Sequence, residues 1–332
     1  MSAQSQAIPL LHEADYPKEE SPWRIVFRRF RRHKLAMISL GVMLIMFTIT
    51  LLARQIAPFD AEEITVGNYF LKPGAIQEAS GKVHLLGTDN LGRDLLSRLV
   101  YAGRISLSVA LLSVLISSVV GVTVGAISGY FGGWIDNLLM RVVEFFLTIP
   151  SLPLLLIISA MLLKNQDAIP IPPLILDLAG KMMLLEPREA RQAVLIIIVL
   201  AGLGWLTAAQ LMRGMVLSLR NQTFVEAARA MGAGSFWIIL RHMIPNAMAP
   251  IIVDASLNMA NYVVAEAALS FLGFGIQEPI PTWGNMLAAT QAYMLDMPWL
   301  PLIPGLPIFL CSLAFNYIGD GLRDALDPRL KL

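Results

Sequence analysis

Six long apolar stretches, nearly free of charged residues, are separated by polar segments along the chain. They cover residues 35–53, 105–131, 136–163, 193–212, 248–274 and 298–319. Each is close to the roughly 20 apolar residues that cross a bilayer as a helix. Pro150 and Pro153 lie within the third stretch and predict a bend there, because proline interrupts the helical hydrogen-bond ladder. The pattern predicts an all-α polytopic membrane protein with six transmembrane helices.

The basic residues predict how these helices are oriented. Seven of the 25 Lys and Arg residues precede the first stretch, in a segment that includes RIVFRRFRRHK. Such clusters stay in the cytoplasm and contact anionic lipid headgroups. Because the first stretch is long enough to cross and lacks a small-residue cleavage site, we expect it to remain as an anchor. Six spans then place both termini in the cytoplasm.

This orientation divides the chain into five parts. They are a cytoplasmic basic segment (1–34), a first transmembrane helix (35–53), an extracytoplasmic segment (54–104), a five-helix core (105–319) and a cytoplasmic tail (320–332). Within the core, residues 164–191 form a long outer connection. We interpret it either as a tolerated surface loop or as an insertion that contacts another protein.

Composition supports a membrane protein and excludes several other classes. The chain is 56% hydrophobic and 15% charged, whereas soluble domains are roughly 45–50% apolar and about 25% charged. A net charge of +1 gives no reason to expect nucleic-acid binding. The single cysteine, Cys311, excludes an internal disulfide and any metal site built from several cysteines, and the four histidines have no metal-ligand spacing. We expect no catalytic residue and no metal site.

One cytoplasmic connection, 213–247, is predicted to contain an ordered amphipathic helix. Its apolar positions recur at helical spacing and are Phe224, Ala227, Ala228 and Met231. Gly232 and Gly234 are expected to end this helix through a left-handed cap, and Pro245 to end the following piece. A helix lying on lipid headgroups carries bulky apolar residues and a Lys/Arg-rich polar face. This helix has neither, so a protein partner fits it better.

The fifth stretch carries two acids, Asp254 and Glu266, together with Asn258 and Asn261. Acids inside a membrane span are costly enough to suggest a function. They are candidates for lining a polar translocation pathway and meeting a substrate amine. The alternative is that they make hydrogen bonds between packed helices.

A second polar motif, Gly87-Thr88-Asp89 with Gly92-Arg93-Asp94, precedes the second stretch. It predicts a turn and a helix start, with Thr88 or Asp89 as the cap. We interpret the motif as structural bracing or as a contact surface for a partner.

The order of Glu226-Ala227-Ala228, Gly232 and Ile244-Pro245-Asn246 resembles the EAA loop of ABC-importer permeases, although Ile244 departs from the leucine that is frequent there. HLLGTDNLGRDLLSRLVYAGRISL (84–107), ALSFLGFGIQEPIPTWGNML (268–287) and GDGLRDALDPRLK (319–331) resemble permeases of the dipeptide, oligopeptide and nickel import group. With the long basic N-terminus, the combination resembles the second ("C") permease of the peptide systems. The resemblance covers the chain from about residue 23, apart from 164–191.

The resemblance implies a type I ABC-importer permease (MetI-like) fold with a coupling helix within 222–240. Glu226, Ala227, Ala228, Gly232 and Pro245 would then couple this chain to the ATPase. The implied partners are a second homologous permease, two cytoplasmic ABC ATPase subunits and an extracytoplasmic solute-binding protein, in a prokaryotic inner membrane. ATP and Mg would be bound by the ATPase subunits, and no cofactor by this chain, which has no GxxxxGK[ST] motif.

The cargo is left open among dipeptides, longer peptides, nickel complexes and glutathione-like molecules. A self-contained secondary transporter or channel is the alternative function. It would favour inverted repeats and several charged residues buried in mid-span. An intramembrane enzyme would need a nucleophile–base pair or an HExxH-type site, which the sequence lacks.

Overall fold

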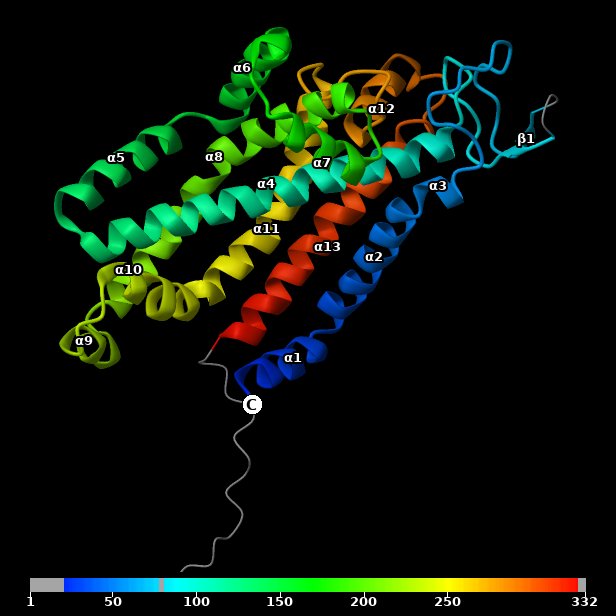
Figure 1. Cartoon of the computed structure of the whole chain (residues 1–332). Helices are drawn as coiled ribbons and strands as arrows, with labels where there is room; N and C mark the ends of the chain where they lie inside the picture. The colour runs from blue at the N-terminus through cyan, green and yellow to red at the C-terminus, as the bar shows by residue number, and fades with distance from the viewer. Residues whose placement is uncertain (1–20, 78–80, 328–332) are drawn as a thin grey trace, which may run out of the picture.

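The computed structural model describes residues 21–77 and 81–327, which form an elongated helical bundle with one small hairpin (Figure 1). The predicted N-terminal segment and C-terminal tail therefore lie partly outside the described residues. Five helices in the described part are long and apolar enough to cross a membrane. They belong to α2 (Lys34–Leu51), α4 (Leu95–Phe131), α8 (Pro187–Leu219), α11 (Ile244–Phe271) and α13 (Leu302–Leu326). The prediction of an all-α multi-pass protein is confirmed.

The predicted third span is broken into α5 (Gly133–Thr148) and α6 (Ser151–Lys164), which meet at 94°. Ile149 is extended (φ −87°, ψ 131°), because a residue before proline is forced out of the helical region. Pro153 lies in the first turn of α6, where proline is tolerated. The predicted bend is thus a full break, and a sixth span is reached only if the two helices are counted together.

The outer connection 164–191, which we interpreted as a surface loop or an insertion, is largely helical. It contains the short 3-10 helix η1 (Gln166–Ala168) and the helix α7 (Pro173–Met183), and its last residues already belong to α8. α7 packs against α8 through an apolar face in which Leu176 and Ala179 are buried. Arg104 on α4 donates to the carbonyls of Met182 (2.8 Å) and Leu51 (3.0 Å), so α7 is tied to the ends of α2 and α4.

α4 and α8 form the centre of the bundle because three glycines let them approach closely. Gly121, Gly125 and Gly129 recur every four residues on the face of α4 that contacts α8. A Cβ atom at Gly121 would lie only 2.6 Å from the Cβ of Ala208. Small residues at this spacing are a known means of close helix packing in membranes, where hydrophobic burial between helices contributes little.

The connecting elements gather at the two ends of the bundle (Figure 1). One end holds α3 (Ala53–Ile56), the hairpin of β1 (Ala75–Ile76) and β2 (Val83–His84), and α12 (Trp283–Thr290) with the 3-10 helix η3 (Gln291–Tyr293). The other holds α1 (Pro22–Arg32), α9 (Thr223–Ala230), α10 (Ser235–Ile238) and the π-turn η2 (Ile239–Met243). This grouping agrees with the predicted sidedness, in which 54–104 and 213–247 lie on opposite sides.

Candidate functional site

α9 is fixed to the bundle by one face and presents the other to the outside. Val225 and Ala228 are buried in an apolar cluster that also contains residues of α4, α8, α10 and α11. The guanidinium of Arg229 lies 5.2 Å from the ring centroid of Tyr130 on α4. Glu226 and Ala227 are exposed. Ala228, predicted on the partner-facing stripe, therefore faces inward, because Val225 and Ala228 share the side of the helix that packs on its own chain.

Gly232 ends α9 in the predicted left-handed conformation. Its φ is +83°, a region that residues with a Cβ rarely adopt, and the Ala233 amide donates to the Ala228 carbonyl at 3.0 Å. Gly234 has φ −67° and ψ 150° and is instead the N-cap of α10. The left-handed cap is confirmed at Gly232 only, and the predicted segment 222–240 comprises two short helices and the start of a π-turn.

Large apolar side chains are exposed on α9, α10 and the turns next to them. We call this group the α9–α10 patch; its members are Phe224 (37% exposed), Met231 (82%), Phe236 (71%), Trp237 (52%) and Leu240 (52%). His242 lies beside it, with its ring centroid 4.9 Å from that of Trp237. Contiguous exposed apolar side chains rimmed by polar groups mark interaction sites.

Pro245 does not end a helix, as predicted, but lies in the first turn of α11. The π-turn at Ile239–Met243 joins α10 to α11, so the helical path runs without interruption from Ser235 to Phe271. The absence of a proline N–H is tolerated here because the wider turn already displaces the regular hydrogen-bond ladder. One continuous helix therefore connects the α9–α10 patch to the opposite end of the bundle.

Glu266 on α11 is completely buried and serves helix packing in this structure. Its carboxylate accepts hydrogen bonds from the hydroxyls of Ser106 on α4 and Ser270, both at 2.8 Å. The same Ser106 hydroxyl accepts from the Trp283 amide at 3.4 Å. This arrangement agrees with the helix-packing alternative and does not place Glu266 on an open surface.

Asp254 and Asn258 lie instead along two open cavities beside α11. The α13 cavity, of about 570 Å³, is lined by α8, α11 and the end of α13, and Asp254 belongs to its wall. The α6 cavity, of about 490 Å³, is lined by the α5–α6 break, α8 and α11, and Asn258 belongs to its wall. Asn258 donates to the Asp254 carboxylate at 3.0 Å, which joins the two cavities by a polar contact. Asn261 is exposed and donates to Asn258 at 3.3 Å.

At the other end, the predicted turn before α4 is held by many short hydrogen bonds. The Thr88 hydroxyl accepts from the Leu71 amide at 2.8 Å, and the Asp89 carboxylate accepts from the Leu91 and Arg93 amides, both at 2.9 Å. The N-cap of α4 is Asp94, which accepts from the Ser97 amide at 2.7 Å. The prediction that Thr88 or Asp89 caps α4 is therefore wrong, because both residues close the turn that precedes the helix.

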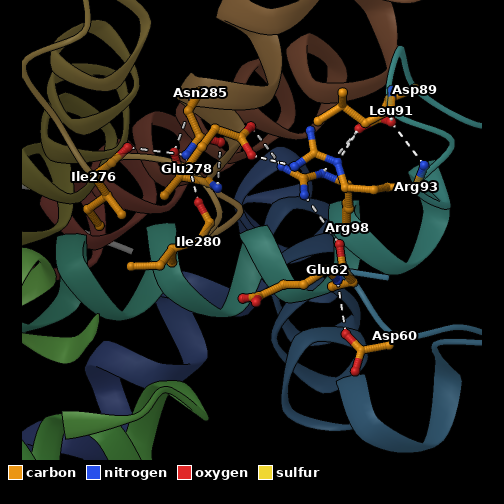
Figure 2. A network of polar contacts seen from close by, with 12 residues as sticks. Asp60, Glu62, Asp89, Leu91, Arg93, Arg98, Ile276, Glu278, Ile280 and Asn285 are labelled. Atoms are coloured by element: carbon orange, nitrogen blue, oxygen red, sulfur yellow. Dashed lines mark hydrogen bonds and ion pairs between the residues drawn. The ribbon is translucent and has the colours of Figure 1, made fainter. Parts of the chain in front are cut away.

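Two buried arginines then bind this turn to the connection between α11 and α12 (Figure 2). Arg93 pairs with Asp89 at 2.7 Å and with Glu278 at 2.5 Å, and Arg98 pairs with Glu278 at 3.0 Å. Burial disfavours the charged form of Arg93, but the attraction of Glu278 and Asp89 outweighs this effect and raises the pKa of Arg93. The Arg98 side chain is 2% exposed and that of Glu278 43% exposed. The bracing interpretation of the motif is thus supported by geometry.

Arg98, Glu278 and the glycine repeat of α4 are not among the features predicted from the sequence. The spacing of Gly121, Gly125 and Gly129 was a readable signal for close helix packing. Arg98 and Glu278 are far apart in the chain, and neither has a local pattern that indicates the other. In the described residues, no group of three or more His, Cys, Asp or Glu side chains could hold a metal ion.

Comparisons with known proteins agree with these features. A family model described as binding-protein-dependent transport system inner membrane component matches residues 121–332, and one described as the N-terminal TM domain of oligopeptide transport permease C matches residues 21–73. The glutathione transport system permease protein GsiD of Pectobacterium atrosepticum is 35% identical over 94% of this chain and 92% of its own length.

Two further relatives are similar to the same extent. The dipeptide transport system permease protein DppC of Alkalihalophilus pseudofirmus is 36% identical over 94% of this chain and 91% of its own. The oligopeptide transport system permease protein OppC of Mycobacterium tuberculosis is 37% identical over 92% of this chain and 94% of its own. The resemblance inferred from the sequence motifs is confirmed. The chain belongs to the family of binding-protein-dependent transport system inner membrane components, the permease subunits of ABC importers.

Proposed function

We propose that this chain forms, with a second homologous permease, the pathway through which short peptides enter the cytoplasm of a prokaryotic cell. Two ABC ATPases bind at the α9–α10 patch of the permeases, and a solute-binding protein delivers the peptide at the opposite end. Both termini are cytoplasmic and the membrane is the inner membrane. ATP and Mg are bound by the ATPases.

The observation that carries this proposal is the exposed apolar surface on a helix that is otherwise anchored. α9 is held to the bundle by Val225 and Ala228, while its outer side and α10 present the α9–α10 patch. An apolar patch that is exposed to water marks an interaction site, so a cytoplasmic partner covers it. The uninterrupted helix from Ser235 to Phe271 then transmits movement of that partner along the bundle.

The cavities beside α11 support a second membrane subunit. Both cavities are partly open to the surface of this chain, and a path for a polar peptide through lipid needs a closed polar wall. A second homologous permease supplies that wall. Peptide cargo is supported by the relatives, which are named for dipeptide, oligopeptide and glutathione transport. A self-contained transporter or channel is disfavoured because the family consists of subunits that depend on a binding protein.

Gly232→Asp tests the coupling role. The substitution forces a Cβ into the left-handed region, which costs about 1–2 kcal/mol, and places a negative charge at the C-terminus of α9. In proteoliposomes that contain the whole complex, we expect ATP-driven dipeptide uptake to fall while membrane insertion stays normal. Gly234→Asp is the matched control, since it adds the same charge at an N-cap position that favours aspartate.

Equal uptake by the Gly232→Asp and wild-type complexes would show that α9 is not the coupling element. The partners are tested separately by gentle extraction from the native membrane and mass spectrometry of the bound proteins. We expect a second membrane subunit and one or two P-loop ATPases. Recovery of this chain alone, under conditions that preserve other complexes, would contradict the proposed assembly.

A further inference from the structure

Asp254 on α11 and Arg323 on α13 both line the α13 cavity, and the packing of α11 against α13 fixes their register. The two helices run antiparallel, and Gly319 of α13 contacts α11 so closely that a Cβ there would lie 2.6 Å from Leu257 Cδ2 (Figure 1). Asp254 precedes Leu257 by three residues and Arg323 follows Gly319 by four. At about 1.5 Å per residue, these offsets are roughly 4.5 and 6 Å towards the same end, so the two residues lie at nearly the same level.

Both residues also lie on the faces of the helices that meet. Positions three or four apart share one face of a helix, so Asp254 shares the face of Leu257, and Arg323 shares the face of Gly319. Both line the same cavity, whose wall also includes Asn246 and Asp327. The carboxylate and the guanidinium therefore face one space from neighbouring helices.

The two charges nevertheless do not pair with each other. Among the described residues, Asp254 has one side-chain partner, the Asn258 amide at 3.0 Å, and Arg323 forms no ion pair. The cavity that both residues line has a volume of about 570 Å³, which is large enough to hold a small molecule. The site thus offers the Asp254 carboxylate and the Arg323 guanidinium to one ligand, and the wall also contains Asp327 beside Arg323.

We propose that Asp254 and Arg323 bind the two termini of a short peptide in the α13 cavity, after it has left the binding protein. The Asp254 carboxylate accepts hydrogen bonds from the peptide ammonium group, and the Arg323 guanidinium donates to the peptide carboxylate. A ligand with only one charge meets repulsion from the opposite member, whereas a zwitterion satisfies both. This inference rests on the proposed function, because the ligand is its cargo.

The size of the cavity also limits the length of the peptide. An extended chain spans at most about 3.3–3.6 Å per residue, so a dipeptide or tripeptide is roughly 7–11 Å long, which a cavity of about 570 Å³ can hold. A pentapeptide can engage both termini only by folding back, which costs conformational freedom. The site therefore favours the shortest peptides among those that the complex imports.

The test measures peptide binding to the whole complex in nanodiscs without the binding protein, by isothermal titration calorimetry. The probes are Ala-Phe, N-acetyl-Ala-Phe and Ala-Phe-amide. For the wild type we expect Ala-Phe to bind at least about tenfold more tightly than either blocked form, as expected for the loss of one charged hydrogen bond. Asp254→Asn should abolish the preference over the N-acetyl form alone, and Arg323→Gln the preference over the amide alone. Asp320→Asn, an exposed change on α13 outside the cavity, is the control.

This crossed pattern cannot result from a general loss of structure, which would weaken all three probes together. Equal affinity for free and blocked peptides in the wild type would overturn the inference, as would a parallel loss in both variants. So would undetectable binding by a complex that imports Ala-Phe when the binding protein is present. Failure of that import, in contrast, would contradict the proposed peptide cargo itself.

Discussion

Replacing Glu278 by glutamine removes the charge that joins the turn before α4 to the connection between α11 and α12. Glu278 neutralises Arg98, whose side chain is 2% exposed and whose next nearest acid, Asp89, lies 3.8 Å away and is shared with Arg93. After the change, Arg98 keeps a hydrogen bond to the Ala61 carbonyl at 3.2 Å but loses its closest counter-charge. The amide of glutamine retains the shape of the side chain, so packing changes little.

The expected loss is moderate because Glu278 is partly exposed. A hydrogen bond to a charged group contributes about 1.5–3 kcal/mol, and the 43% exposure of Glu278 favours the lower end, near 1.5 kcal/mol. This corresponds to roughly a tenfold increase in local opening. Hydrogen–deuterium exchange of the complex should show it as faster exchange of the amides of Thr88, Asp89 and Leu95, which are hydrogen-bonded across the turn.

A second glutamate gives the matched control. Glu144 lies 3.8 Å from Arg141, and both side chains are largely exposed, so Glu144→Gln should leave exchange unchanged throughout. The increase in Glu278→Gln should be confined to residues 83–95 and 272–282, with the rest of α4 and all of α8 unaffected. Exchange within twofold of wild type at the turn would refute the reasoning that charge, rather than packing, fastens these segments.

Three other predictions concern packing, a buried charge and pH. Gly204→Ala should destabilise the complex in a thermal unfolding assay, because its methyl group would overlap the Tyr262 hydroxyl, whereas Gly202→Ala meets nothing within 4 Å and should be neutral. Asp136→Asn should lower the melting temperature through a loss of about 1–3 kcal/mol, since Asp136 accepts from Arg213 at 2.5 and 2.7 Å; equal melting temperatures would contradict this. Burial raises the pKa of Glu62, so the folded chain binds a proton more readily than the unfolded chain. The free energy of unfolding should therefore rise as the pH falls from above the raised pKa of Glu62 to the ordinary pKa of a glutamate. The Glu62→Gln variant should show less of this rise.

The sequence predicted what depends on local pattern and missed what depends on distant contacts. Long apolar runs require membrane helices, and Gly232 predicted its own left-handed cap, because both follow from neighbouring residues. Pro150 indicated a bend, but the size of the break depends on how α6 packs. The burial of Glu266 and the pairing of Arg98 with Glu278 could not be predicted, since their partners lie on other helices. Asp254 and Asn258 were named as candidates, and only the structure shows that cavities adjoin them.

The packing of α2 has a consequence for how the protein is made. α2 lies mainly against α13, where the Met46 and Cys311 sulfur atoms are 3.7 Å apart and separated by 265 positions in sequence. At roughly 5–20 residues per second, the ribosome needs about 13–53 s to add that length. The first span to be synthesised must therefore wait in the bilayer for the last one. Ribosomes that stall before α13 leave α2 without its main neighbour, and we expect the quality-control proteases of the membrane to recognise such chains by this unfilled side.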